Sequence, residues 1–455
     1  MDIDLKSASQ FGGAYVQVVA YQEWIVASRV GGLQVFSDLG ALHCLSECAL
    51  IDIPLLKIFN GKLYAVFKTC VQRVCVDFAG NISLEQDSHV DLKYEKPRGH
   101  DYQIDFSGGR FVLDREHASV STPTGEIKLP GYSRPSGMAL SSDLQRLYVA
   151  DMGIIHQLLC DGGLWRITDG FYESTGWPKD VACEHGNVFV ANVLGVSWYQ
   201  ETNEYPYLRL QDRICKFHFR IAKVEVRNSL VYACDEARGL HVFEARNGKL
   251  KPIGGLFVEG GGWDFLLKED GGFLASGAGG WHWFENLNNA MRMMPSVKVH
   301  RDAGTDERIQ GIACWSRAEA VVIMSSMRVL ILDASLSKEL YSLECNAWSG
   351  IAADDLFVVA SPSGLFVFSF DGMVHFAERV ETTEARDVAW DGHYLWVADG
   401  KGGVKCFSIG EDRKSLIYCG CFPVCGFCRG ICRTATRIYI GAGDGGLVVI
   451  KSSEV

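Results

Sequence analysis

The stretch Tyr394-Leu-Trp-Val-Ala-Asp-Gly-Lys-Gly-Gly-Val-Lys-Cys-Phe407 is the clearest copy of a pattern that recurs along the whole chain. A short apolar strand ends in small residues, a glycine-rich turn follows, and a second strand alternates apolar residues with others. Alternation with period two is typical of a β-strand, and a glycine-containing turn between two such runs predicts a β-hairpin. The stretch therefore predicts β-structure, and its recurrence predicts a repeat protein.

Copies of this hairpin pattern are spread from one end of the sequence to the other. Four clear copies are 24–28 with 32–36, 230–234 with 239–243, 356–360 with 364–368, and 438–442 with 446–450. Weaker copies begin at Leu63, Arg110, Leu147, Val188, Gly272 and Ala320. The starts lie about 40 residues apart, which is the length of a propeller blade.

Each hairpin has a further strand on either side. A short run such as Asp387-Val-Ala-Trp390 comes before it and ends in a turn, here Asp391-Gly392, and a more polar run such as Ala41 to Leu45 comes after it. Four antiparallel strands in about 40 residues make one propeller blade, whose two apolar faces are buried only by stacking against other blades. The sequence therefore predicts an all-β fold, a β-propeller of about eleven four-stranded blades.

About eleven blades exceed the four to eight that a single ring usually holds. Two rings of about five and six blades, or one unusually large ring, both satisfy the pattern. We place the blades of the N-terminal half in 1–220 and those of the C-terminal half in 221–455. The last copy lacks an outer strand, so residues near Leu5 to Ser9 are expected to complete it. The segment from Asn286 to Met294 allows a short helix.

The repeat resembles that of the LVIVD-repeat β-propeller proteins, whose unit reads as an apolar residue, Tyr-Val-Ala-Asp, a Gly-Leu pair and then Val-Ile-Asp. Leu147-Tyr-Val-Ala-Asp151 and Leu395-Trp-Val-Ala-Asp399 match its first part, and Val329-Leu-Ile-Leu-Asp333 matches its last part. The resemblance covers nearly the whole chain, although most copies lack the final Asp. It implies the fold and little about activity, because propellers carry many unrelated functions.

Composition narrows the class of partner. The formal net charge of −11 disfavours nucleic acid and anionic membranes, which both need a basic face. No apolar run is long enough to cross a membrane, and Met1 to Lys6 does not begin a secretory signal. Sixteen cysteines without such a signal indicate a reducing compartment, so we expect a cytoplasmic protein with mostly free thiols.

Two motifs resemble known sites but fit the repeat better. Gly441-Ala-Gly-Asp-Gly-Gly446 matches the G-x-G-x-x-G pattern, yet a strand follows it where a dinucleotide site needs a helix. Five cysteines lie close together at Cys419, Cys421, Cys425, Cys428 and Cys432, and two of them have the C-x-x-C spacing of zinc and redox sites. Strand alternation sends neighbouring side chains to opposite faces, which favours packing over metal binding. We predict no cofactor and no metal, and the role of this cluster stays open.

The best candidate site comes from the register of the repeats. Residues that enter the innermost strand of each blade should gather at one mouth of the central channel. The polar members of this set are Asp101, Lys179, Asp180, Lys223, Asp264, Arg386, Asp387 and Arg429. Charges of both signs around one opening suit a small polar ligand, and the two arginines suit an acid group. The alternative is a ring of internal ion pairs that fixes the register of the blades.

Two functions remain open. The first is a non-catalytic interaction platform that binds a protein partner, or a small polar or anionic ligand, at a propeller face. The second is an enzyme, such as a hydrolase, lyase or isomerase, with a polar active site at the channel mouth. Propeller enzymes draw single residues from several blades, so the lack of a linear catalytic motif decides little between the two.

Overall fold

The computed structural model describes most of the chain. The described residues are 8–11, 14–30, 32–37, 43–50, 53–87, 90, 92–93, 101–129, 135–141, 144–151, 154–172, 177–193, 195–203, 208–215, 220–258, 261–268, 271–276, 280–287, 290–293, 307–434 and 437–451. Over these residues the chain forms eleven four-stranded sheets and no α-helix, and every strand pairing whose register is described is antiparallel. The predicted all-β propeller fold is confirmed.

Each sheet is one copy of the repeat, and in ten of the eleven sheets the strands pair in chain order. In the copy quoted first these are β38 (Asp387–Trp390), β39 (Tyr394–Ala398), β40 (Val404–Ile409) and β41 (Leu416–Phe422). Asp391 shapes the turn between the first two, because its Oδ1 accepts hydrogen bonds from the backbone N–H groups of His393 and Tyr394 at 2.8 and 2.7 Å. This explains why an Asp-Gly pair stands between two apolar runs.

The chain divides into two compact units, which we call the larger and the smaller unit. The larger unit holds residues 8–9, 178–443 and 447–451, and the smaller unit holds 10–177 and 444–446. Besides β38 to β41, the larger unit contains β1 (Ala8–Phe11, which runs into the smaller unit), β18 (Pro178–Glu184), β19 (Asn187–Asn192), β20 (Gly195–Glu201), β21 (Leu208–Cys215), β22 (Ile221–Arg227), β23 (Leu230–Asp235), β24 (Gly239–Arg246), β25 (Lys249–Phe257), β26 (Gly262–Lys268), β27 (Gly271–Ser276), β28 (Gly280–Leu287), β29 (Ala290–Met293), β30 (Ile309–Trp315), the short 3-10 helix η2 (Ser316–Ala318), β31 (Ala320–Ser325), β32 (Arg328–Asp333), β33 (Glu339–Glu344), β34 (Ser349–Ala353), β35 (Leu356–Ser361), β36 (Gly364–Phe370), β37 (Val374–Val380), β42 (Gly430–Arg433), β43 (Arg437–Gly441) and β44 (Leu447–Lys451).

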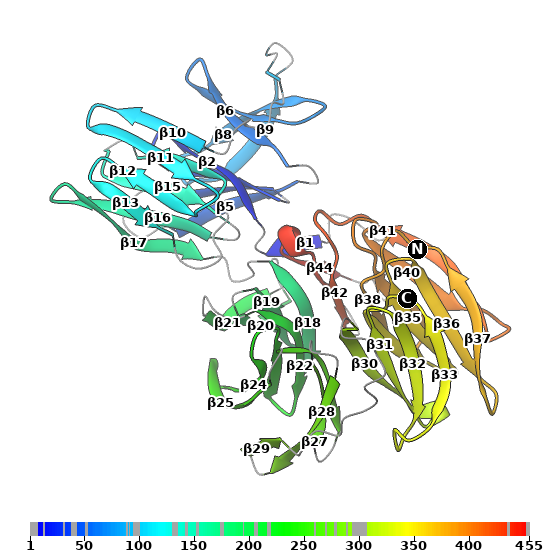
Figure 1. The fold of residues 1–455 in the computed structure, drawn as a ribbon. Coiled ribbons are helices and arrows are strands. Elements are labelled where there is room, and N and C mark those ends of the chain that lie inside the picture. Colours follow the sequence, from blue (N-terminus) through cyan, green and yellow to red (C-terminus); the bar gives the residue numbers. More distant parts are fainter. Residues whose placement is uncertain are drawn as a thin grey trace. The chain divides into compact units, whose positions relative to one another are not determined.

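The larger unit is a closed ring of seven blades. Its innermost strands are β18, β22, β26, β30, β34, β38 and β42; each contacts the next, and β42 contacts β18. Figure 1 shows these sheets in succession around a common centre, from green through yellow and orange to red. The last blade has the order β1-β44-β43-β42, so a strand from the N-terminal end of the chain completes it. Ala8 and Ser9 lie in this strand as expected, while residues 5–7 fall outside the described part of the chain.

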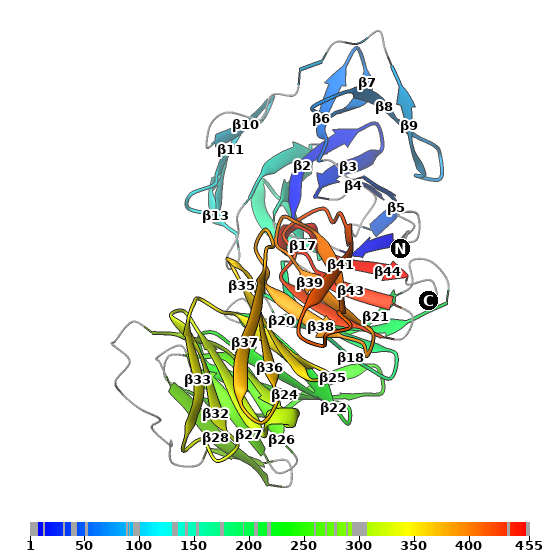
Figure 2. The same cartoon turned by 90° about the vertical axis from the view of Figure 1, so that its right-hand side faces the viewer.

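The smaller unit holds the other four blades (Figure 2). Its strands are β2 (Tyr15–Tyr21), β3 (Trp24–Arg29), β4 (Gly32–Ser37), β5 (His43–Ala49), β6 (Leu55–Phe59), β7 (Lys62–Val66), β8 (Val71–Val76), β9 (Ile82–Gln86), β10 (Asp101–Phe106), β11 (Gly109–Asp114), β12 (Ser119–Thr122), β13 (Gly125–Lys128), β14 (Gly137–Leu140), β15 (Arg146–Ala150), β16 (Ile154–Asp161) and β17 (Leu164–Tyr172). The innermost strand β2 contacts both β14 and β6, and β10 contacts β14. The first blade of this unit therefore packs against its last blade.

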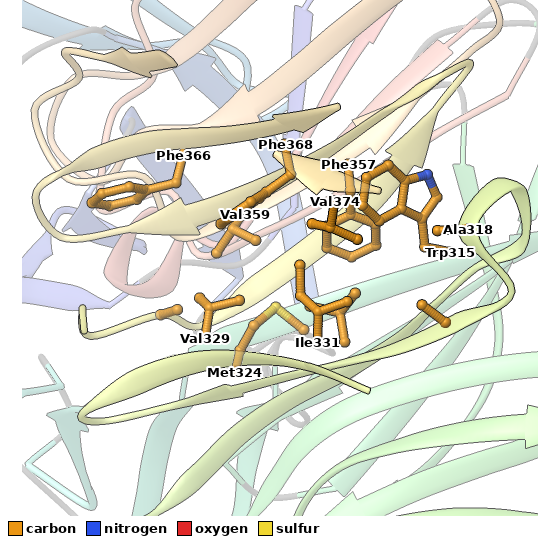
Figure 3. Close-up of a cluster of buried hydrophobic side chains, with 13 residues drawn as sticks. Trp315, Ala318, Met324, Val329, Ile331, Phe357, Val359, Phe366, Phe368 and Val374 are labelled. Carbon is orange, nitrogen blue, oxygen red and sulfur yellow. The ribbon is translucent and has the colours of Figure 1, made fainter. Parts of the chain in front are cut away.

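The core lies between neighbouring blades, as stacking requires. Figure 3 shows the cluster between the blades that begin with β30 and β34, where Met324 and Ile331 of one blade meet Phe357 and Phe368 of the other. All four side chains are at most 1% exposed. Burial of apolar side chains is the main stabilising term, so each blade depends on its neighbours for stability.

Two details of the sequence-based expectation differ from the structure. The boundary between units lies at residues 177 and 178, whereas residues 220 and 221 separate two blades inside the larger unit. In a repeat array the passage from one ring to the next needs no linker, so composition does not mark it. The segment from 286 to 294 contributes the end of β28 and β29 and forms no helix in its described residues, because these two strands pair as a hairpin.

Candidate functional site at the mouth of the seven-bladed unit

A cavity of about 190 Å³ lies where the innermost strands of the larger unit begin. We call this end of the ring the mouth. Each blade contributes one residue to what we call the mouth layer. This residue lies just before the innermost strand or near its start. Around the ring the members of the mouth layer are Lys179, Ala222, Trp263, Gln310, Trp348, Arg386 and Arg429, and all of them line the cavity.

The next residue along each strand forms a second layer. Strand pairing defines this second layer. In each blade, the second-layer residue of the innermost strand pairs with a residue at or near the end of the next strand, as Asp180 pairs with Ala191 and Asp387 with Ala398. Around the ring the second layer reads Asp180, Lys223, Asp264, Gly311, Ser349, Asp387 and Gly430. Seven of the eight residues predicted from the repeat register thus line one cavity.

The three aspartates of the second layer reach across to the next blade. Asp180 Oδ2 accepts a hydrogen bond from the N–H of Val224 at 2.9 Å, and Asp264 Oδ2 accepts one from Ile312 at 2.9 Å. Asp387 Oδ2 accepts one from Ile431 at 3.0 Å. Each carboxylate therefore satisfies a buried amide of the following innermost strand. These hydrogen bonds fix the register of adjacent blades, so the aspartates are part of the scaffold.

The remaining oxygens of two of these aspartates also have partners. Asp264 Oδ1 accepts a hydrogen bond from the N–H of Phe265 at 2.8 Å. Asp387 Oδ1 accepts one from the Ser349 hydroxyl at 2.5 Å. All three aspartates are less than 10% exposed. Their carboxylates point into the wall between blades and have little capacity left for a ligand.

Gly430 occupies the second layer where the last blade meets the first. A Cβ at this position would lie 2.6 Å from the Cα of Asp180 and 2.9 Å from its Oδ1. Any side chain would therefore force apart the two blades that close the ring. The absence of a side chain here is what lets Asp180 take its place at the seam.

Lys223 is the one cation of the second layer. Its Nζ lies 3.9 Å from Asp180 Oδ2, and its side chain is 33% exposed at the cavity. Burial by itself would lower the pKa of this ammonium group, but the carboxylates of Asp180, Asp387 and Asp264 together raise it well above its usual value. Lys223 is therefore positively charged at every physiological pH.

The pKa values of the carboxyl groups around Lys223 are raised as well, which favours the neutral form of these groups. Burial raises the pKa of Asp180 to about 7, and the nearby Asp387 adds to this while Lys223 opposes it. Burial also raises the pKa of Asp264, again against Lys223. Glu225, two residues further along β22, has its pKa raised to about 7 by burial, with Lys223 and Arg227 opposing. Near neutral pH the negative charge around the cavity is thus reduced, whereas the positive charge is kept.

Two arginines stand side by side in the mouth layer, on the sixth and seventh blades. The Arg386 guanidinium stacks on the Trp348 ring, with Cζ 3.4 Å from the ring centroid, and it forms an ion pair with Glu384. Phe427 lies between the arginines, 5.0 Å from Arg386 Cζ and 5.3 Å from Arg429 Cζ. Burial lowers the pKa of Arg386, and Arg429 adds to this effect against Glu384. Aromatic rings therefore hold two like charges close together.

Lys179 faces a different partner. Its Nζ forms an ion pair with Glu236, which stands just after β23 and also lines the cavity. The side chains are 17% and 19% exposed. Like the pair of Arg386 with Glu384, this pair is locally neutral.

Asp101 is the one predicted residue that the cavity lacks. It begins β10 in the smaller unit and pairs with Asp114. It therefore belongs to a blade of the other unit, and the register alone could not show this. Four further residues line the cavity that the register-based prediction did not include: Ala222, Trp348, Ser349 and Glu236. Three of them occupy the same two register positions as the predicted residues, so strict use of the register would have found them, whereas Glu236 comes from a turn.

The other motifs behave as parts of the repeat. Gly441 ends β43, the short 3-10 helix η3 (Gly443–Gly445) follows, and then β44 begins, so the glycine pattern lies in a turn between strands. The side chains of fifteen of the sixteen cysteines are described, and these fifteen are free thiols. Cys406 and Cys428 belong to a buried apolar cluster, and burial raises the pKa of Cys406 to about 12. Over the described residues no group of His, Cys, Asp and Glu is arranged to hold a metal ion.

Among the described residues, no helix is both long and apolar enough to span a bilayer.

Comparison with known proteins identifies similar folds only. No protein-family model and no curated protein sequence matches the chain. Among solved structures, it is similar to U3-55K at 10% identity and a TM-score of 0.49, covering 61% of this chain and 95% of that one. It is similar to BamB from Moraxella catarrhalis at 12% identity and a TM-score of 0.45, covering 69% and 96%. It is also similar to PorZ of Porphyromonas gingivalis, a component of the type-IX secretion system, at 12% identity and a TM-score of 0.49, covering 97% and 69%.

These neighbours are β-propeller proteins. At such low identity nothing about the function of this chain follows from them. The resemblance of the repeats to the LVIVD unit stays a prediction.

Proposed function

We propose that the larger unit is a non-catalytic binding module that holds a small anionic ligand in the mouth cavity. The observation that carries this proposal is an asymmetry of the charged groups. The carboxylates of Asp180, Asp264 and Asp387 are engaged by backbone amides of the next blade. Lys223, Arg386 and Arg429 line the same cavity, and among the described residues no blade-to-blade amide contact engages them in the way it engages the three carboxylates.

The two arginines suit an acid group because their planar guanidinium groups donate paired hydrogen bonds to carboxylate or phosphate oxygens. Stacking on Trp348 orients Arg386 before any ligand arrives. Its buried Nε has no hydrogen-bond partner among the described residues. A donor that is already desolvated and oriented costs little more to bind a ligand.

The finer expectations from the sequence remain proposals. These are a protein partner for one propeller face, an LVIVD-type repeat and a cytoplasmic location. The enzymatic alternative rests on Asp180, whose pKa of about 7 suits a general base. Its engagement with Val224 favours the scaffold role.

The test uses inorganic phosphate as the probe, with binding followed by isothermal titration calorimetry. We expect Arg386→Gln to weaken phosphate binding about tenfold or more, since a charge-assisted hydrogen bond contributes about 1.5–3 kcal/mol. Arg413→Gln is the matched control, because Arg413 is 76% exposed and does not line the cavity. Equal binding by wild type and both variants, or no binding by wild type, would refute the proposal.

Native mass spectrometry of protein purified from its own cells would then identify the natural ligand. A copurifying small acid that the protein leaves unchanged supports a binding module. Chemical conversion of that acid by the purified protein would establish the enzymatic alternative instead.

A further inference from the structure

The mouth layer places an aromatic side chain opposite the two arginines. The seven blades follow one another around the ring, with Trp263 on the third blade and Arg386 and Arg429 on the sixth and seventh. From the third blade, the sixth is three steps away in one direction and the seventh is three steps away in the other. Trp263 therefore lies across the cavity from the pair of arginines.

The indole of Trp263 is available to a ligand. It lines the cavity, and the described part of the chain offers it neither a hydrogen-bond partner nor a stacked ring. Trp348, by contrast, is covered by the Arg386 guanidinium at 3.4 Å. The layer thus contains one tryptophan that orients an arginine and another on which no ring or guanidinium of the described residues stacks. An unoccupied aromatic face in a cavity suits a planar ring or an apolar ligand surface.

Gln310 adds a third feature on the blade next to Trp263. Its side-chain Oε1 is buried and accepts no hydrogen bond within the described residues. A buried acceptor without a donor destabilises the protein. A ligand that carries a hydroxyl or N–H donor would relieve this destabilisation.

The size of the cavity limits the ligand. Its volume of about 190 Å³ is below the roughly 300 Å³ at the lower end of sites for drug-sized molecules. On the other side of Trp263 the layer member is Ala222, which leaves space beside the indole. One ring with one acid group fits this volume.

We propose that the mouth cavity binds a single-ring aromatic acid with a hydrogen-bond donor on the ring. The acid group binds Arg386 and Arg429, the ring stacks on Trp263, and the donor meets Gln310 Oε1. This inference rests on the proposed function, because it names the chemical class of the anionic ligand. It adds Trp263 and Gln310 as the residues that determine specificity.

The test compares acetate, benzoate and 4-hydroxybenzoate by calorimetric titration. Stacking on an aromatic side chain contributes about 1–3 kcal/mol, so wild type should bind benzoate about tenfold more tightly than acetate. Trp263→Leu should remove this preference and leave the affinity for acetate unchanged. Trp263→Phe, which keeps an aromatic face, should retain part of the preference and checks that the fold is intact. Gln310→Met should remove only the gain from benzoate to 4-hydroxybenzoate.

The outcomes separate this inference from the proposed function. If acetate and benzoate bind wild type equally, or if Trp263→Leu weakens both alike, the aromatic-acid inference is wrong while the anion site stands. If phosphate, acetate and benzoate all fail to bind, both proposals fall.

Discussion

The two units use the same interblade contact with different chemistry. In the smaller unit, Gln17 occupies the second-layer position of β2, and its Nε2 donates to the carbonyl of Leu56 at 3.0 Å while its Oε1 accepts from the N–H of Leu56 at 2.9 Å. In the larger unit, Asp180, Asp264 and Asp387 accept from the corresponding amides. A neutral amide thus makes the contact as well as a carboxylate does.

This difference shows that the negative charges of the larger unit are not needed for blade register. A buried carboxylate is costly unless cations or hydrogen bonds compensate it. Here the compensation includes Lys223, whose pKa the three carboxylates raise. The smaller unit makes the hydrogen bond between blades with a neutral side chain, whereas the larger unit makes it with charged carboxylates. We infer that the carboxylates are present to keep a cation at the floor of the mouth cavity.

The largest expected effect comes from removing one carboxylate of the larger unit. Asp264→Ala should lower the free energy of unfolding by about 2–5 kcal/mol, because it leaves the buried amides of Phe265 and Ile312 without an acceptor. Denaturant unfolding followed by circular dichroism measures this loss.

Asp264→Asn is the closest control for that substitution. It loses the charge and keeps an acceptor oxygen for one of the two amides, while its NH2 group faces the other. We expect it to cost less than Asp264→Ala, because one buried amide keeps its acceptor. An equal loss for Asn and Ala would mean that this remaining hydrogen bond does not hold the blades, which would contradict the comparison.

A smaller effect is expected from placing a charge in the smaller unit. Gln17→Glu keeps the acceptor for the Leu56 amide but has no donor for the Leu56 carbonyl. We expect a loss of about 1–3 kcal/mol above the pKa of the new carboxyl group, and less below it. Thermal unfolding at pH 4.5 and pH 7.5 gives both values. A variant as stable as wild type at pH 7.5 would show that this position accepts charge freely.

The smallest effect is the dependence of stability on pH. The folded-state pKa of Asp180 is raised to about 7, so near pH 6 the folded protein binds a proton that the unfolded chain has already released. Protonation of Asp180 stabilises the folded state. This contribution to the free energy of unfolding is complete below the pKa that Asp180 has in the unfolded chain, and it is lost as pH rises through 7, with a loss of about 1 kcal/mol between pH 6 and pH 8. Asp180→Asn should flatten this part of the stability profile. A variant with the same slope as wild type would assign the dependence to other groups, such as Glu225.

The sequence by itself determined the blade and most of the site. Period-two alternation and recurrent turns such as Asp391-Gly392 specify hairpins locally, so eleven copies could be counted without a structure. The same register placed Lys179, Asp180 and Arg386 at equivalent points of their repeats. Residues at equivalent points of stacked repeats meet at one end of a ring, and this is why seven of the eight predicted residues line the cavity.

Only the tertiary structure decided which blades share a ring and what each charged group does. The contact of β42 with β18 closes a ring of seven, and neither partner carries a local signal for it. This closure assigns Asp101 to the other unit. The stacking of the first blade on the second likewise brings Glu236 to Lys179 and the Val224 amide to Asp180, although these pairs are 57 and 44 residues apart in sequence. Local patterns specify strands because they act over a few residues, whereas closure, burial and the resulting pKa values depend on contacts that form only when the blades meet.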